Sequence, residues 1–271
     1  MQIHNRILFL AVAASVIAPG QWLKHPDAGL SRAANGIPNL AAPIHKTTDG
    51  KPDLSGVWQA APDPDAMKIP GGGDPILAPK YSISIAGGFN PGNLPLQPWA
   101  ADLFKERGAN SLKDQPTSSC KPLGTTERDA WPLPFKLIQT SNLIVLLYEM
   151  DTVFRQVFLD GRALPADPQP SFLGYSVGRW EGDTLVVDTS GFQDRGWLDL
   201  MGHPHSDALR MEERFRRADS GHMDIKVTFN DSKAYTGPVS FTQPHDLLPD
   251  TDLLEYFCTE NERDRRHFVD Q

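Results

Sequence analysis

Short apolar or alternating segments follow one another at regular spacing between residues 135 and 229. The clearest covers residues 222–229, where Met223, Ile225, Val227 and Phe229 alternate with polar side chains. Such alternation places one face of a strand against a core and the other against solvent. Gly, Asp and Asn turns separate the other segments, which cover residues 143–148, 153–159, 172–179 and 184–189. The pattern predicts a mainly β fold, an antiparallel meander closed as a barrel or stacked as a sandwich.

The segment before these strands predicts one short helix between irregular loops. Residues 98–107 begin with Pro98, place Trp99, Leu103 and Phe104 at helical spacing, and are followed by Gly108. Proline at the start and glycine at the end are typical helix boundaries. Residues 61–98 hold eight prolines and six glycines, so we expect long Pro/Gly-rich loops there.

The first twenty residues predict a signal peptide. Residues 7–18 are apolar except for Ser15, Arg6 precedes them, and Pro19-Gly20 ends the run. The run is too short for a membrane-spanning helix, which needs about 20 residues, although an uncleaved anchor is an alternative. After signal removal we expect no integral membrane span. The expected organisation is a signal peptide (1–20), a linker or N-terminal arm (21–50) and a single β-barrel domain (51–271).

Charge and cysteine content indicate an exported protein with no nucleic-acid partner. The net charge is −8, with acidic and basic residues interspersed, whereas a nucleic-acid surface requires a basic face. Cys120 and Cys258 are the only two cysteines. In an oxidising compartment they would form a disulfide, and the alternative is two separate buried thiols. We therefore expect a periplasmic or secreted location.

Several phrases resemble those of a largely uncharacterised family of exported bacterial proteins. The match spans most of residues 51–260 and consists of Lys51-Pro52-Asp53-Leu54-Ser55-Gly56-Val57-Trp58, Asp160-Gly161-Arg162, Trp180-Glu181-Gly182-Asp183-Thr184-Leu185-Val186-Val187-Asp188-Thr189, Gly202-His203-Pro204-His205-Ser206 and Glu213-Arg214-Phe215. This resemblance implies export and brings no catalytic residue with it.

Gly56-Val57-Trp58 also resembles the Gly-x-Trp phrase that opens the first strand of lipocalin-like proteins. The Thr-Asp-Tyr phrase of that group is not apparent. The resemblance implies an antiparallel lipocalin-like (calycin) β-barrel in which the tryptophan closes one end and the open end holds a small apolar ligand. A plain core role for Trp58 is equally compatible with its position.

His203 and His205 form the densest group of reactive side chains. Two residues at positions i and i+2 of an extended segment face the same way, which leaves three alternatives open. They are an exposed surface turn, a general acid or base near neutral pH, or a cupin-like metal site that would take a third ligand from His222 or His245. We expect acid/base chemistry without a cofactor or metal.

Arg155 and Glu213 are the other catalytic candidates. Arg155 shares a strand face with Val153 and Val157, so it either extends to solvent or is held inside by a carboxylate. Glu213 shares a face with Phe215. If that face points inward, Glu213 has a raised pKa or an arginine partner, and either would mark a site.

Four further residues are expected to contact a ligand. Tyr148 and Tyr175 could donate hydrogen bonds inside a barrel, although single tyrosines often belong to the core or rim. The other two are Ser206, which directly follows His205, and Trp197, which precedes His203 by six residues. Ser206 lacks the Gly-x-Ser-x-Gly phrase of a serine hydrolase.

Two functions remain open from the sequence. One is a cofactor-independent lyase, isomerase or hydratase that acts on a small apolar or aromatic molecule, with His205 as acid or base and Arg155 at a developing oxyanion. The other is a non-catalytic protein that binds such a molecule. Convergence of His205, Arg155 and Glu213 would favour the enzyme, whereas an apolar cavity without them would favour the binding protein. The sequence sets no oligomeric state.

Overall fold

The computed structural model describes residues 26–27, 29–63, 78–88, 90, 92–194 and 196–258. The expected signal peptide and residues 64–77 of the expected Pro/Gly-rich loops lie outside these ranges. In the described part of the chain, no helix has the length and apolar character needed to cross a membrane.

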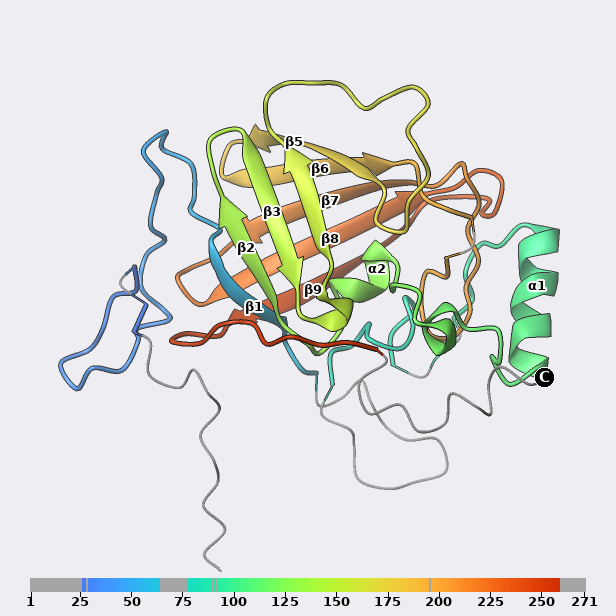
Figure 1. Ribbon diagram of the computed structural model, residues 1–271, viewed down its shortest axis with the longest axis horizontal. Coiled ribbons are helices and arrows are strands. Elements are labelled where there is room, and N and C mark those ends of the chain that lie inside the picture. The colour runs from blue at the N-terminus through green and yellow to red at the C-terminus, as the bar shows by residue number, and fades with distance from the viewer. Residues whose placement is uncertain are drawn as a thin grey trace, which may run out of the picture.

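Nine strands of the described residues close into a β-barrel, as the sequence predicts (Figure 1). Each strand pairs with its neighbour in sequence, and the last pairs with the first. The strands are β1 (Gly56–Ala60), β2 (Phe135–Gln139), β3 (Leu143–Tyr148), β4 (Phe154–Phe158), β5 (Tyr175–Glu181), β6 (Thr184–Ser190), β7 (Arg210–Arg217), β8 (His222–Asn230) and β9 (Val239–Leu247).

Eight of the nine neighbouring pairs are antiparallel, as expected, and one pair, β4 and β5, is parallel. Parallel neighbours need a connection of a dozen or more residues. Residues 159–174 supply it, and their prolines at 165, 168 and 170 oppose a regular strand. This connection is the long loop drawn over the barrel in Figure 1. The β4–β5 ladder contains only the pairs Val157–Ser176 and Phe158–Val177.

β5 begins at Tyr175, three residues later than the apolar pattern suggests. Gly174 has a φ of +67°, a left-handed conformation that glycine adopts without steric penalty. The residues just before this bend do not pair with β4. Ser171 forms a bridge with Phe192 instead. The bend at Gly174 therefore separates the start of β5 from β4.

The tryptophan of the Gly-x-Trp phrase lies fully inside the barrel, as the lipocalin-like resemblance implies. Trp58 Nε1 donates to the carbonyl of Leu54 at 2.9 Å. The guanidinium of Arg217 lies over the Trp58 ring, 4.9 Å from its centroid. The guanidinium therefore packs against the buried ring.

Helix α1 (Pro98–Ala109) confirms the expected helix and continues two residues beyond its predicted end. It lies outside the barrel, where Trp99 Nε1 donates to the carbonyl of Lys233 at 2.7 Å. Phe104 stacks on the ring of His203 with centroids 4.2 Å apart. Three shorter helical segments were not expected: η1 (Pro116–Ser119), α2 (Thr125–Arg128) and η2 (Met150–Thr152).

The N-terminal arm and the segment around Cys258 each contact parts of the chain that are distant in sequence. In the N-terminal arm, Arg32 Nη1 donates to Asp250 Oδ2 at 3.0 Å, and the carbonyl of Ala42 accepts from the N–H of Ser220 at 2.9 Å. Cys120 and Cys258 are joined by a disulfide, so the first of the two alternatives for these cysteines holds.

Candidate functional site

Arg155 and Glu213 meet inside the barrel. Arg155 Nη1 donates to Glu213 Oε1 at 2.9 Å, and Nη2 donates to Oε2. The Arg155 guanidinium also donates through Nε to Ser176 Oγ at 3.0 Å and through Nη2 to Thr189 Oγ1 at 2.8 Å. These residues come from β4, β7, β5 and β6, so the cluster crosses the interior. Of the alternatives for Arg155, capture by a carboxylate is the one observed.

Asp129 adds a second carboxyl group to this cluster. Its Oδ2 lies 4.0 Å from Arg155 Nη1. Burial and the neighbouring charge of Glu213 raise the pKa of Asp129 well above its usual value. Burial tends to lower the pKa of Arg155, but the charge and hydrogen bonds of Glu213 outweigh burial and raise it. A proton held on Asp129 adds no further charge to the buried ion pair of Arg155 and Glu213.

Tyr148 and His245 complete the polar interior around Asp129. The Tyr148 hydroxyl donates to Asp129 Oδ1 at 2.9 Å, and burial raises the pKa of this tyrosine well above its usual value. His245 Nε2 lies 2.7 Å from the carbonyl oxygen of Asp129, and Nδ1 lies 3.0 Å from that of Gln243. Burial lowers the pKa of His245 to about 4. Tyr148 thus contacts a carboxyl group of the interior.

The sequence did not predict Asp129 or Gln243 as site residues, and it offered His245 only as an alternative third metal ligand. A signal for the last two was present, because Gln243 and His245 share the inward face of β9 with Phe241 and Leu247. Pro244 obscured that strand, since proline usually argues against one. Asp129 follows the short helix α2 and has no pattern in sequence that would have identified it.

His203 is fully buried, which rules out the exposed surface turn. Its Nδ1 lies 2.6 Å from Asp199 Oδ2. The same carboxyl oxygen accepts from the N–H of Ile85 at 2.9 Å. Together with the stacked ring of Phe104, these contacts tie α1 and the loop at residue 85 to this corner of the barrel.

His205 is 7% exposed and lies in different surroundings from His203. Its Nδ1 is 3.1 Å from the carbonyl oxygen of Ser206, and its ring meets the edge of Phe192 at 6.4 Å between centroids. Burial lowers the pKa of His205, which keeps the imidazole neutral. Within the described ranges, no hydrogen bond or ion pair joins His205 to Arg155 or Glu213. The predicted three-residue convergence is therefore only partly present.

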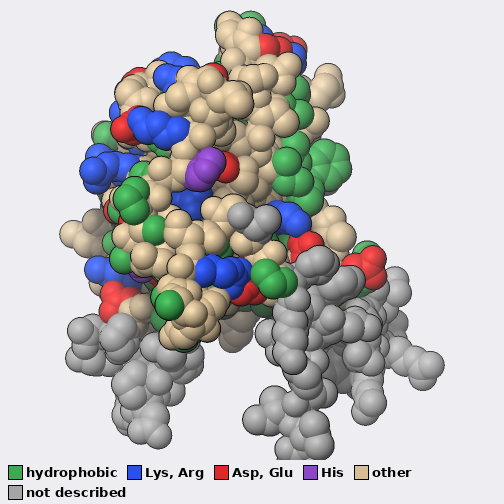
Figure 2. All heavy atoms as spheres, turned by 90° about the vertical axis from the view of Figure 1, so that its left-hand side faces the viewer, with side chains coloured by type: hydrophobic (Ala, Val, Ile, Leu, Met, Phe, Trp, Pro, Cys, Tyr) green, Lys and Arg blue, Asp and Glu red, His purple; other side chains and the backbone are tan. Residues whose placement is uncertain are grey.

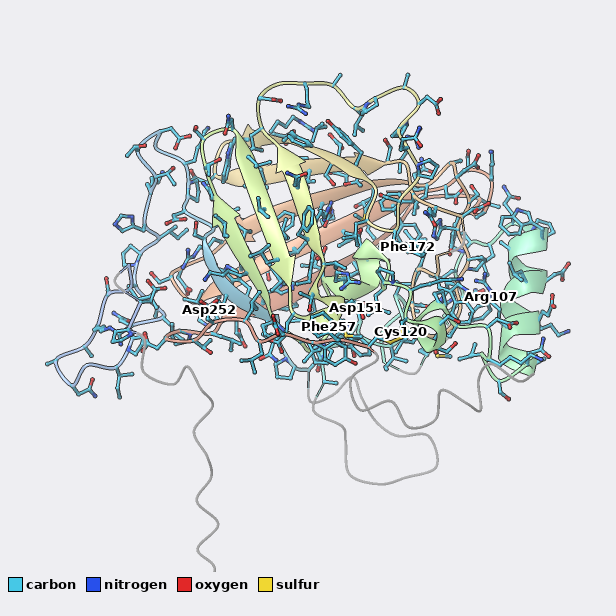
Figure 3. All side chains as sticks on the ribbon, viewed as in Figure 1. Arg107, Cys120, Asp151, Phe172, Asp252 and Phe257 are labelled. Carbon is cyan, nitrogen blue, oxygen red and sulfur yellow. A yellow bond between two sulfur atoms is a disulfide. The ribbon has the colours of Figure 1, made fainter. Side chains whose placement is uncertain are left out.

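The remaining predicted ligand contacts are dispersed. Ser206 binds Asp231 through its N–H and its hydroxyl. Trp197 is buried with the Arg107 guanidinium 4.5 Å from its ring centroid, and Arg107 extends from α1 to donate to the carbonyl of Gly202 at 2.8 Å (Figure 3). Among the residues the structure describes, no three His, Cys, Asp or Glu side chains are grouped so as to hold a metal ion.

A cleft of about 450 Å³ opens where β4 and β5 separate. Its aromatic lining comes from Phe154, Phe158, Phe172 and Tyr175, and the Phe158 and Tyr175 rings stack 5.3 Å apart. Its polar lining includes Gln156, Arg155 and Ser176. Phe172 is labelled in Figure 3. The cleft thus borders the strands that carry the buried Arg155 cluster.

Two other hollows offer less to a ligand. A groove of about 590 Å³ runs between the N-terminal arm and the barrel end, but its charged Lys136 and Asp250 already pair with Asp252 and Arg32. A cavity of about 10 Å³ lies beside His205 and shares Phe172 with the cleft. That volume suits about one water molecule.

No protein-family model, curated protein or solved structure matches this chain. Membership of the exported bacterial family therefore stays a prediction. The closed barrel itself agrees with the lipocalin-like resemblance. Figure 2 shows acidic and basic side chains intermixed on one face.

Proposed function

We propose that this chain binds a small, largely apolar aromatic molecule in the cleft between β4 and β5. The observation that carries this proposal is the cleft of about 450 Å³ that opens where the two strands separate. Four aromatic side chains line this cleft. Ligand sites in proteins commonly enclose roughly 300–1,000 Å³ with apolar walls and a few polar groups.

The exposure of Phe154 supports the same proposal. This side chain is 63% exposed at the edge of the cleft. An aromatic ligand that covers it removes apolar surface from water, which contributes about 1.5–3 kcal/mol for a large side chain. Arg155 and Ser176 already bind partners inside the barrel, so they shape the floor of the cleft, and its aromatic walls supply the affinity.

The experiment is a titration with N-phenyl-1-naphthylamine, a neutral aromatic probe whose fluorescence rises in apolar surroundings. We expect saturable binding that weakens about tenfold or more in Phe154→Asp, which introduces a charge at the cleft. The matched control is Ile37→Asp, because Ile37 is equally exposed, at 61%, and does not line the cleft. Equal affinity of both variants and the unmodified protein would refute the proposal.

Catalysis by His205 is the second candidate, and one observation keeps it open. Phe172 lines both the cleft and the small cavity beside His205, so rotation of this ring would join the two spaces. A neutral His205 could then accept a proton from a bound molecule in a lyase or isomerase reaction. His205→Ala would abolish turnover and leave probe binding unchanged; normal turnover would remove His205 from the mechanism.

We also propose that the protein works outside the reducing cytoplasm, in the periplasm or beyond the cell. The disulfide between Cys120 and Cys258 supports this location, because such bonds persist in oxidising compartments. Fractionation of cells that produce the full chain tests it. Recovery in the cytoplasm, with both thiols free, would contradict it.

A further inference from the structure

The peptide groups along β4 alternate in direction, and their direction can be assigned from two hydrogen bonds to β3. The N–H of Tyr148 donates to the carbonyl of Val153 at 2.9 Å, and the N–H of Leu159 donates to that of Asn142 at 2.8 Å. In an antiparallel pair, hydrogen-bonded positions alternate with non-hydrogen-bonded ones. Val153 and Leu159 therefore belong to the set that faces β3, and every second residue between them does too.

The other set, Phe154, Gln156 and Phe158, directs its peptide groups away from β3 and toward β5. The β4–β5 ladder begins only at Val157. Within the described part of the chain, the N–H and C=O of Phe154 and the N–H of Gln156 therefore face the cleft without a strand partner. Both residues line the cleft.

These free groups have the spacing of an extended peptide. Residues two apart on a strand are separated by about 6.6–6.8 Å, which is the repeat at which another strand presents its own N–H and C=O groups. Peptides commonly bind by adding a strand to such an edge, with side-chain pockets alongside it. Here the walls beside the edge are Phe154, Phe158 and Phe172.

We infer that the cleft recognises an N-acylated amino acid or a short extended peptide with apolar or aromatic side chains. The ligand's N–H donates to the carbonyl of Phe154, and its carbonyl groups accept from the N–H groups of Phe154 and Gln156. This inference rests on the proposed function, because it assigns a chemical class to the ligand of the same cleft.

The first test uses the unmodified protein and two matched probes. One is the tripeptide acetyl-Phe-Val-Phe-amide, and the other is the same peptide with every internal amide nitrogen methylated. A hydrogen bond contributes about 0.5–1.5 kcal/mol net, so we expect the methylated peptide to bind about three- to tenfold more weakly or worse. Equal affinity of the two peptides would overturn the inference.

Amide hydrogen exchange gives a readout that simple apolar contact would not produce. Bound tripeptide should slow exchange at Phe154 and Gln156, whereas Arg155 and Val157, whose peptide groups face β3, should change little. Uniform slowing along β4, or no slowing at all, would contradict recognition by main-chain hydrogen bonds.

A pair of variants tests the protein side. Gln156→Pro removes one N–H that faces the cleft and spares the β3 ladder, the setting in which strands tolerate proline. Gln156→Ala keeps that N–H and is the matched control. We expect about three- to tenfold weaker tripeptide binding in Gln156→Pro than in Gln156→Ala, and equal affinity of the two variants would contradict the assignment of this N–H.

The outcomes separate this inference from the proposed function. Binding of N-phenyl-1-naphthylamine without any effect of amide methylation would refute peptide recognition and leave the aromatic site intact. Failure of both probes would refute both. If Gln156→Pro does not fold, the comparison of the two peptides on the unmodified protein still decides the question.

Discussion

Arg155 on β4 and Glu213 on β7 form a two-point ion pair across the barrel interior, with Arg155 Nη1 at 2.9 Å from Glu213 Oε1. The two strands are not neighbours in the sheet, and both side chains are buried. The pair therefore links two strands that are separated by β5 and β6, in the interior where a lipocalin-like fold would hold its ligand. This arrangement is why we place the proposed ligand between two strands.

Removing one member of this pair should destabilise the fold strongly. In Glu213→Gln the Arg155 charge stays buried without its carboxylate, so we expect a loss of about 3–5 kcal/mol in the free energy of unfolding. Chemical denaturation measures it. The double variant Arg155→Met/Glu213→Leu should recover most of the loss, because two apolar side chains leave no charge behind.

The matched control for this prediction is an ion pair on the outer surface. Glu181 pairs with Arg214 at 2.6 Å and with Arg179 at 3.1 Å, all three at least one-third exposed. Exposed pairs contribute about 0–1 kcal/mol, so Glu181→Gln should change stability by no more than this. Equal losses in Glu181→Gln and Glu213→Gln would show that burial of the Arg155 pair carries no special energy.

Asp129 should make the fold less stable as the pH rises. Burial and the Glu213 charge raise the pKa of Asp129 in the folded state, whereas an unfolded aspartate titrates near about 3.9. The stabilisation from its bound proton is complete below the unfolded pKa and is lost as the pH rises through the folded pKa. Relative to Asp129→Asn, the unmodified protein should lose up to about 1.4 kcal/mol per pH unit over that window.

Urea denaturation between about pH 2 and pH 8 tests this sign against an aspartate of opposite behaviour, whose contribution to stability changes below about pH 4. The hydroxyl of Thr47 lowers the pKa of Asp49. Asp49→Asn should therefore lose stability relative to the unmodified protein as the pH rises, and Asp129→Asn should gain it. A pH-independent difference for Asp129→Asn would mean that this carboxyl group is ionised in the folded barrel.

The sequence predicted the barrel and part of its polar interior for identifiable reasons. Alternation along residues 222–229 and the apolar neighbours of Arg155 both depend on the two-residue repeat of a strand, which is a local property. The partners of Arg155 come from strands up to 58 residues away. Their meeting depends on how the barrel closes, which no local pattern encodes.

The parts of the structure that the sequence did not predict have equally specific causes. β9 was not predicted because Pro244 lies within it and because polar Gln243 and His245 occupy inward positions. His205 was expected beside Arg155, but it faces Phe192 and Gly196. The cleft depends on a parallel pairing of two residue pairs, and the alternation of single strands does not reveal which neighbours separate.

Replacing Gly174, at the bend beside the cleft, should destabilise the fold. Its φ of +67° is unfavourable for other residues, and an added Cβ would lie 2.6 Å from Thr189 Cγ2 and 2.9 Å from the carbonyl oxygen of Ser190. Gly174→Ala thus combines backbone strain of about 1–2 kcal/mol with overpacking of about 1–3 kcal/mol. Gly161→Ala isolates the strain, because Gly161 has a φ of +81° and nothing within 4 Å. Thermal denaturation should show the larger loss for Gly174→Ala, and equal losses would refute the overpacking.

The disulfide between Cys120 and Cys258 should account for a substantial part of the stability. It closes a loop of 138 residues, for which the chain-entropy model gives about 5 kcal/mol as an upper figure. A reducing agent should therefore lower the melting temperature of the unmodified protein, and Cys120→Ser/Cys258→Ser should melt at that lower temperature with or without reductant. Thiol titration confirms that the reductant has freed both cysteines. If the melting temperature is then unchanged, the bond makes no contribution to stability. In that case the segment that ends at Cys258 is held by other contacts, such as the one between Thr152 Oγ1 and the carbonyl of Tyr256, 2.8 Å apart.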